Sequence, residues 1–422
     1  MIQPEIKEIS KVDLLKLEKR VLSNGMDMYI INAGKQDLIK VDVLFDAGNA
    51  YSKHPVLPGA ISALMNDGTS SYTSEQIADI IDGKGAFYVG DIQKDYSQCS
   101  LYLLSRFADD LLPLYHDMIT DSIFPEEEVE LFKRNMKQRF LVEHAKVNVQ
   151  SNQAMINAVF GEDSRYADLA KVESYDSLSR KEMLSFYEER VKRSPQCIIV
   201  SGKVDDKLAA QIAHQFENID RINKDQKNEM PVYGAVASRE DWIRIPGKNN
   251  QQVSMRIAMP TIMPDHKDYY GLTMLTTILG GYFGSRLNKV LREEKGLTYG
   301  VHAHLTKLRH ASVLMIHSEL NVDNWEEAYL AIIEIIDDLK QNLISDKELE
   351  MVRRYIKGSL LHSIDGAFTF SNYHRNTLMY QLEGDRINRF IHYLDRVSSK
   401  DLKYLAEQYL IENNFYKIVA GV

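Results

Sequence analysis

The 422-residue chain runs twice through the same order of predicted elements. In each half a strand precedes two helices, two further strands follow, and several helices lead to a final strand. The repeated unit is about 210 residues long, far above the roughly 20–50 residues of a solenoid repeat. A duplication of this size predicts two homologous domains, because a single hydrophobic core stops growing at roughly 250–300 residues.

Local patterns predict the elements within each half. The dipeptide Asn24-Gly25 stands between two apolar runs, a strong hairpin signal, and residues 39–45 alternate as in a half-buried strand. Runs of strands followed by runs of helices are typical of α+β domains. We therefore expect in each half a mostly antiparallel sheet with helices packed on one face. The predicted helices lie near 56–67, 74–82, 107–121, 125–145, 150–160, 179–192, 269–281, 285–296, 324–341, 345–362, 366–381 and 398–410.

The polar segment 219–238 (IDRINKDQKNEMPVYGAVAS) has no sustained periodicity and is the predicted linker. It divides the chain into an N-terminal domain, 1–218, and a C-terminal domain, 239–422.

Composition narrows the function classes. The net charge of −9 argues against nucleic acid as the main partner, and no apolar run reaches the ~18 residues of a membrane span. The first 20 residues lack the apolar core of a secretory signal. Cys99 and Cys197 both lie in strand-like contexts, which favours two buried free thiols over one disulfide. These features predict a cytoplasmic protein without a membrane partner.

The segment 280–300, GGYFGSRLNKVLREEKGLTYG, begins with three glycines in five residues. A purely structural account is available: an apolar helical stripe bounded by Ser285 and Gly296, with Arg292 solvated and Tyr299 on the inward face of the next strand. The glycines do not form G-x-G-x-x-G, and no G-K-[ST] follows them, so a nucleotide site is not expected.

The same segment, read as GG-x-x-x-SRL-x-x-x-LRE-x-x-GL-x-Y, resembles a signature in the C-terminal half of pitrilysin-type zinc peptidases, in particular the mitochondrial-processing-peptidase branch. The segments LSNGMDMYII, DAGN, the GT at 68–69, FPEEEVELFK and IIVSGKV occur in the order of that family. The resemblance implies that Arg292 and Tyr299 face a cleft, where they bind the peptide backbone or polarise the scissile carbonyl. It also implies that Gly280 and Gly281 allow a close approach of backbone and substrate.

The chain departs from the family at the metal site. Pitrilysin-type peptidases carry H-x-x-E-H on a first-half helix, where two histidines bind zinc and the glutamate activates water. The corresponding positions here are Gly59, Ser62 and Ala63, and none of them can act as ligand or base. The third zinc ligand of the family would fall near 139–140, where this chain has Arg139 and Phe140.

Two other groups are candidates for an atypical metal site. Glu143 and His144 are near the third-ligand position, but adjacent residues point in different directions on a helix. His302 and His304 share one face of a predicted strand, and His310 or His317 could join them only if the next strand pairs in the right register. We interpret these histidines as polar residues on a wet or interface face of the strand. His374 and His392 stand alone in helices.

The resemblance leads to three functional hypotheses. In the first, the chain is the non-metal subunit of a heterodimeric zinc metallopeptidase: it binds no cofactor itself and presents a peptide or unfolded segment to a homologous zinc-bearing partner. In the second, it is a catalytically inert scaffold, similar to the core subunits of the respiratory bc1 complex, for which a homodimer is one expected form. In the third, it is a peptidase with ligands drawn from Glu143, His144, His302 and His304.

Overall fold

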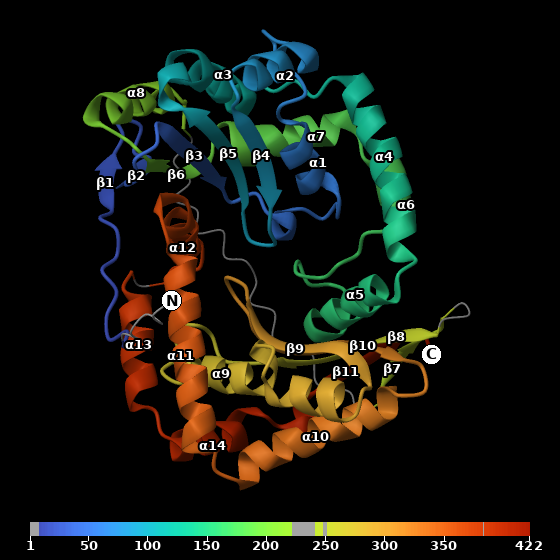
Figure 1. Ribbon diagram of the computed structural model, residues 1–422. Helices are drawn as coiled ribbons and strands as arrows, with labels where there is room; N and C mark the ends of the chain where they lie inside the picture. The colour runs from blue at the N-terminus through green and yellow to red at the C-terminus, as the bar shows by residue number, and fades with distance from the viewer. Residues whose placement is uncertain (1–7, 222–240, 248–250, 383) are drawn as a thin grey trace.

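The computed structural model describes residues 8–221, 241–247, 251–382 and 384–422. Two β-sheets lie at opposite ends of the molecule, joined by α4 (Glu126–His144) along one side and by α11 (Asp346–Ser363) along the other (Figure 1). The predicted linker lies almost entirely outside the described residues, since only 219–221 belong to them. The domain bounds 1–218 and 239–422 therefore remain predictions.

Each sheet is mostly antiparallel, as predicted. The first has the order β1-β2-β6-β3-β5-β4 and the second has the order β7-β11-β8-β10-β9. Among the described strands, each sheet has one parallel pair, β2 with β6 in the first and β7 with β11 in the second, so the parallel pair is also repeated in the two halves. The strands are β1 Glu18–Val21, β2 Asp27–Asn32, β3 Leu38–Phe45, β4 Phe87–Ile92, β5 Ser97–Leu104, β6 Pro195–Gly202, β7 Ile243–Ile245, β8 Gln252–Pro260, β9 Thr298–Lys307, β10 Ser312–Asn321 and β11 Tyr416–Ala420.

Helices make up most of the remaining regular structure in both halves. The other helices of the first half are α1 Leu57–Leu64, α2 Ser74–Gly83, α3 Ala108–Thr120, α5 Val147–Phe160, α6 Val172–Ser177, α7 Arg180–Tyr187 and α8 Asp206–Glu217; those of the second half are α9 Tyr269–Thr276, α10 Trp325–Gln341, α12 Ala367–Met379, α13 Arg386–Arg396 and α14 Ser399–Tyr409. Three of them, α6, α8 and α13, are absent from the sequence-based prediction. No helix in the described ranges is long and apolar enough to span a membrane.

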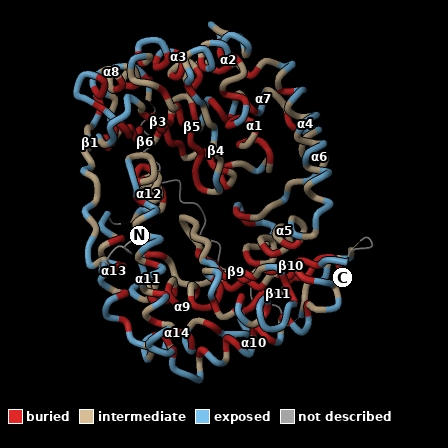
Figure 2. The backbone as a smooth tube through the Cα atoms, viewed as in Figure 1, coloured by how far each residue is buried: buried red, intermediate tan, exposed pale blue. Residues whose placement is uncertain are grey.

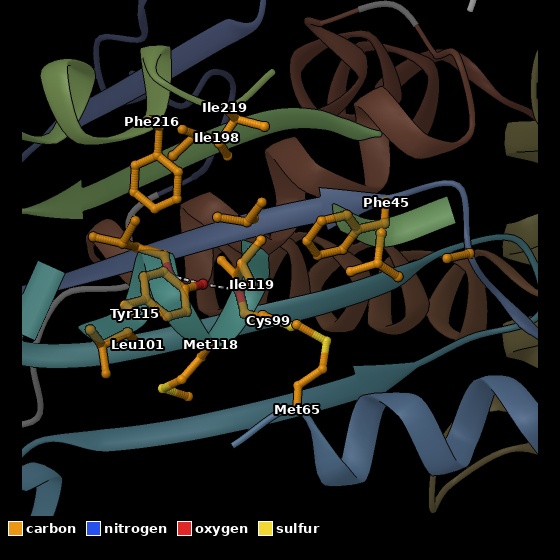
Figure 3. Packing of buried hydrophobic residues seen from close by; sticks show 14 of the residues in the cluster. Phe45, Met65, Cys99, Leu101, Tyr115, Met118, Ile119, Ile198, Phe216 and Ile219 are labelled. Atoms are coloured by element: carbon orange, nitrogen blue, oxygen red, sulfur yellow. Dashed lines mark hydrogen bonds between the residues drawn. The ribbon is translucent and has the colours of Figure 1, made fainter. Parts of the chain in front are cut away.

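The core of the first half lies between its sheet and the helices α1, α3 and α8. Figure 3 shows Tyr115 of α3 beside Cys99, with Phe216 of α8 nearby. The Tyr115 hydroxyl lies 2.7 Å from the carbonyl oxygen of Cys99 and donates to it. Burial raises the pKa of both Cys99 and Cys197 to about 12, so these free, buried thiols are unreactive at neutral pH, as the strand contexts predicted.

The two halves exchange helices across their sheets. Helix α5 of the first half packs on β8 and β11 of the second sheet, while α12 of the second half packs on β6 and β2 of the first. Each exchanged helix completes an apolar cluster, through Met155 and Val159 of α5 and through Phe370 and Met379 of α12. Each sheet is thus partly covered on its second face by the other half, and central strands such as β3 and β11 are almost entirely buried (Figure 2).

A polar network fixes α12 to the first sheet. Asp42 of β3 is 1% exposed and accepts hydrogen bonds from Ser100 of β5, at 2.6 Å, and from Ser371 of α12, at 3.0 Å. The buried amine of Lys40 lies 2.9 Å from the same carboxylate. Because a buried charge is costly unless it is paired and hydrogen-bonded, this saturated network favours one fixed position of α12.

The tip of the β9–β10 hairpin reaches from the second sheet into the first half. Arg309 lies in this tip, and its guanidinium donates to Asp46 and to the hydroxyl of Tyr51, both at 2.9 Å. Its backbone N–H donates to Asp95 at 2.8 Å. The strand that begins at the glycine-rich segment therefore ends in a contact with the opposite half.

Candidate functional site

The glycine-rich segment forms a close turn between two helices. Helix α9 continues into a π-helical turn, Thr277–Gly281, and a second π-helical turn covers Asn288–Glu294. Such turns are rare and are frequent at functional sites. Gly280 is buried against β9, where an added Cβ would lie 2.6 Å from the backbone nitrogen of Ala303. Its missing side chain therefore lets the helix pack directly on the strand.

The second helix ends as the sequence predicts. Gly296 has φ +64°, a left-handed conformation that favours glycine, and the N–H of Leu297 donates to the carbonyl of Leu291 at 2.8 Å. This closure turns the chain directly into β9. It places Arg292, in the last turn of the helix, one short loop away from Tyr299, at the start of the strand.

Arg292 is exposed, and its guanidinium lies over an aromatic ring. Its Cζ is 4.5 Å from the ring centroid of Phe283, a side chain that is itself 65% exposed. Arg292 makes no hydrogen bond or ion pair with any residue that the structure describes. Its N–H donors are thus available to an incoming group, while cation–π stacking limits their orientations.

Arg286, in the same helix, has a different environment. Its guanidinium donates two parallel hydrogen bonds to Glu348, both at 2.9 Å, and a third to Asp338 at 2.6 Å. This arginine joins the glycine-rich segment to α11 and α10 and has a structural role. The contrast identifies Arg292 as the arginine of the segment that can contact a ligand.

Tyr299 is 93% exposed, so it does not lie on the inward face where the purely structural account of this segment placed it. The reason is a bulge. Ser318 of β10 lies opposite Val301 of β9, whereas Leu320 lies opposite Thr298, so β9 contains one extra residue at this point. A bulge interrupts the alternation of faces and can redirect a side chain, which here removes Tyr299 from the core.

Thr298 holds the bulge in place. Its buried hydroxyl donates to the carbonyl of Glu319 at 2.7 Å and accepts from the N–H of Gly300 at 3.1 Å. The hydroxyl of Ser318 donates to it in turn, at 2.9 Å. A fixed bulge gives the exposed Tyr299 a defined backbone position.

Asn288 fixes the helix to the strand and was not identified from the sequence. Its side-chain amide donates to the carbonyl of Val301 at 2.9 Å, and its amide oxygen accepts from the N–H of the same residue at 3.4 Å. The side chain thereby pairs with the outer edge of β9 as a neighbouring strand would. Nothing in the helical pattern of 285–296 indicates this role.

The degenerate metal positions lie on α1. Gly59 is half-buried, Ser62 is buried and Ala63 is exposed. The Ser62 hydroxyl has no hydrogen-bond partner among the described residues, and Gly90 of β4 packs directly on the Ser62 backbone. Two positions without donor atoms and one serine held beneath a strand do not fit a zinc ion, whose ligands are histidine, cysteine and carboxylate groups.

Glu143 and His144, the first candidate pair of atypical metal ligands, point in different directions from α4. Glu143 forms an ion pair with Lys146 at 2.7 Å. His144 instead stacks on Phe140, with ring centroids 4.9 Å apart, and Phe140 packs at 5.5 Å from Tyr175. Phe140, one of the two residues at the third-ligand position, thus belongs to an aromatic cluster with His144 and Tyr175.

The histidines of β9 and β10 do come together. The register places His302 opposite His317, with ring centroids 5.3 Å apart, and His304 lies 5.5 Å from His317. His310 lies in the turn before β10 and stays apart. Desolvation, reinforced by the charge of Arg256, lowers the pKa of His317 to about 4, and desolvation also lowers that of His304. Within the described ranges, no group of three or more His, Cys, Asp or Glu residues has the geometry to hold a metal ion.

Comparison with known sequences supports the resemblance. Residues 177–356 match the family model described as Peptidase M16 inactive domain. The chain is 22% identical over 403 residues to "Uncharacterized zinc protease YmxG" of Bacillus subtilis, a match covering 94% of this chain and 96% of that protein. It is 21% identical over 300 residues to "Probable inactive metalloprotease YmfF" of the same organism, covering 69% and 68% of the two chains.

Solved structures share the fold. A peptidase M16 inactive domain from Pseudomonas fluorescens superimposes with a TM-score of 0.84 at 20% identity, covering 96% of this chain and 98% of that one. A chain of complex III2 from Candida albicans gives a TM-score of 0.76 at 15% identity, covering 96% of both. The chain therefore resembles the M16 zinc peptidases: residues 177–356 match the model of that family's inactive domain, and the fold is that of a solved M16 inactive domain.

Proposed function

We propose that this chain is the metal-free, substrate-binding subunit of a two-chain zinc metallopeptidase. Its Arg292 and Tyr299 would hold a peptide whose bond is hydrolysed on the zinc of a homologous partner. The observation that carries the proposal is the state of Arg292: its guanidinium stacks on Phe283, while its donors have no partner among the described residues. The stacking restrains the guanidinium while its N–H donors remain available, which is the arrangement expected of an arginine that binds a ligand.

The chemistry of the two residues suits peptide binding. A guanidinium offers a planar set of donors that can bind the carbonyl oxygens of an extended peptide. A phenol can donate to the oxygen that becomes negatively charged when a carbonyl is attacked. Tyr299 is 93% exposed at a fixed bulge, so its hydroxyl is accessible from solvent.

The composition of α1 supports a division of labour. Gly59, Ser62 and Ala63 stand where zinc peptidases of this type carry their ligands and base, and they provide neither. The relatives include both proteins named as zinc proteases and one named as an inactive metalloprotease. A chain that binds peptide but lacks a catalytic base could contribute to hydrolysis only together with a homologue that carries H-x-x-E-H.

The test combines the chain with a zinc-bearing homologue from its own host. Fluorogenic peptides are incubated with each chain alone and with the mixture, with and without a chelator. We expect chelator-sensitive cleavage in the mixture, no cleavage by this chain alone, and a drop in kcat/KM of at least about tenfold for Arg292→Ala and for Tyr299→Phe. The control variants are Arg354→Ala and Tyr404→Phe, two exposed residues outside the segment.

Each hypothesis predicts a different outcome. Robust, chelator-sensitive cleavage by the pure chain rejects the proposal and favours a peptidase with atypical ligands. A stable complex or homodimer that binds no peptide favours a scaffold. An active mixture that is indifferent to both variants removes Arg292 and Tyr299 from the mechanism.

A further inference from the structure

A cavity of about 430 Å³ lies next to the glycine-rich segment, between α9, β9 and the helices α11, α12 and α13. Gly281 and Thr277 line one side, and Ala303, His304, Leu305 and Lys307 of β9 line another. Its volume lies within the range of roughly 300–1,000 Å³ typical of small-ligand sites. It shares Gly281 with the segment that carries Arg292 and Tyr299.

Two cationic side chains that line this cavity have no anionic partner among the described residues. The amine of Lys307 lies 5.4 Å from the ring centroid of Tyr380, and Arg386 stacks on Tyr270 at 5.2 Å. Arg386 donates one hydrogen bond, at 2.6 Å, to the carbonyl of Pro264. None of the described Asp or Glu residues lines the cavity or forms an ion pair with either cation.

This arrangement is unfavourable in the absence of a ligand. Desolvation and then repulsion by Arg386 lower the pKa of Lys307. Both cations are half-buried, and a cation that has lost part of its hydration is normally paired with an anion that replaces it. A carboxylate placed between Lys307 and Arg386 would supply the missing charge and accept hydrogen bonds from both.

The remaining lining restricts the ligand further. The hydroxyls of Thr273 and Thr277 already donate to backbone carbonyls of their own helix, and that of Tyr373 donates to Gly384. The other wall is apolar and includes Leu360, Leu382, Ile387 and Phe390. The cavity thus combines positive donors with an aliphatic and aromatic surface, which suits a carboxylate carried on a peptide.

We propose that this cavity is a subsite for a carboxylate group of the bound peptide, held by Lys307 and Arg386. The inference rests on the proposed function, because it takes the ligand to be a peptide. The cavity borders β9 four to eight residues beyond Tyr299, which corresponds to ~13–26 Å at ~3.3 Å per extended residue. The carboxylate would therefore lie about four to eight residues from the position that Tyr299 contacts, as an Asp or Glu side chain or as the C-terminus of the peptide.

The test measures binding by the full chain with fluorescein-labelled peptides and anisotropy. One peptide series places a single Glu, or Gln in its place, at successive positions, and a second compares a free C-terminus with an amide. We expect the preferred Glu or free-acid peptide to bind about tenfold more tightly than its neutral match. Lys307→Met should abolish this difference and leave the affinity for the neutral peptide unchanged.

Control variants separate the charge effect from unfolding. Lys400→Met removes an exposed cation elsewhere and should keep the tenfold preference. Lys307→Met should melt at the same temperature as the parent or above it, because it removes a half-buried charge that has no anionic partner among the described residues. A preference for Glu over Gln identifies a side-chain carboxylate, and a preference for the acid over the amide identifies the chain terminus.

Two outcomes would overturn the inference: no preference in either peptide series, or a preference that Lys307→Met does not change. The proposed function has its own readout in the same assay, since Arg292→Ala should weaken the binding of all peptides. If peptides bind in an Arg292-dependent manner without any carboxylate preference, only the subsite is rejected. If no peptide binds at all, the substrate-binding role is rejected as well.

Discussion

The guanidinium of Arg292 stacks on the ring of Phe283, with its Cζ 4.5 Å from the ring centroid. Both side chains are exposed, so this contact adds little to the stability of the fold. An exposed cation–π contact is worth about 0.5–1 kcal/mol. Its value lies in limiting the positions of an arginine whose donors have no other partner in the described part of the chain.

Phe283→Ala is therefore expected to weaken peptide binding about two- to fivefold, which is the equivalent of the lost stacking energy, while the melting temperature stays unchanged. Peptide titration by anisotropy and thermal unfolding provide the two measurements. Phe283→Trp retains an aromatic face and should keep the parental affinity, whereas Phe283→Leu retains only apolar bulk and should behave like the alanine variant. Equal affinities across all three variants would show that Phe283 does not position Arg292.

Arg286 and Arg292 give a matched pair of predictions within one helix. Arg286 makes three charge-assisted hydrogen bonds to Glu348 and Asp338, so Arg286→Ala should lower the free energy of unfolding by about 1–3 kcal/mol. Arg292→Ala should change it by no more than about 1 kcal/mol, the value of its exposed cation–π contact. Urea unfolding of both variants measures the difference.

The effects of the two substitutions on peptide binding should be the reverse of their effects on stability. Folded Arg286→Ala should bind peptide like the parent, and Arg292→Ala should lose affinity. A variant of Arg292 that is as destabilised as the Arg286 variant would contradict the separation into a structural and a ligand-contacting arginine.

Much of the fold could be predicted because the relevant signals are local. The Asn24-Gly25 dipeptide predicts the β1–β2 hairpin, and Gly25 indeed has φ +76°. Helix α13 was missed although Ile387, Phe390, Ile391 and Leu394 are all buried at helical spacing. The apolar pattern of α13 is present in the sequence, so this helix could have been predicted.

The site was harder to predict because its geometry depends on distant residues. The alternation along β9 would place Tyr299 on the buried face of the strand. It faces solvent because a bulge, defined by the register with Ser318 and Leu320, shifts the alternation by one residue. The role of Asn288 depends on the edge of β9, and the exchange of α5 and α12 depends on how two duplicated halves pack. None of these relationships is encoded within one helix or strand.

Gly280 and Gly281 are adjacent but should respond differently to alanine. A Cβ on Gly280 would lie 2.6 Å from the backbone nitrogen of Ala303, and neither backbone can move without separating the helix from the strand. We expect Gly280→Ala to destabilise the chain by about 1–3 kcal/mol, as overpacking does. A Cβ on Gly281 would lie 3.3 Å from the side chain of Thr277, so Gly281→Ala should change stability by less than about 1 kcal/mol.

Thermal and urea unfolding of the two variants test this difference. Equal stabilities would mean that the turn can shift away from β9. Because Gly281 also lines the cavity, peptide affinity of Gly281→Ala reports separately on whether that wall contacts a ligand.

His374 should make the stability of the chain depend on pH. It is 9% exposed in α12, with its ring 4.7 Å from Tyr29 of the first sheet, and desolvation lowers its pKa from 6.5 to about 4. Above about pH 6.5 the histidine is neutral in the folded and the unfolded chain. As the pH falls from 6.5 to 4, the unfolded chain binds a proton that the folded chain does not, so the folded state loses stability.

The expected loss from this residue approaches about 1.4 kcal/mol per pH unit within that window and stops below pH 4, where both states are protonated. Urea unfolding at half-unit steps from pH 7.5 to 4 measures this loss of stability. His374→Phe should flatten the profile by that amount, whereas His392→Gln, which changes an exposed histidine on α13, should leave it unchanged. The same slope in His374→Phe and the parent would mean that His374 is protonated inside the fold, and the contact between α12 and the first sheet would then need a different electrostatic account.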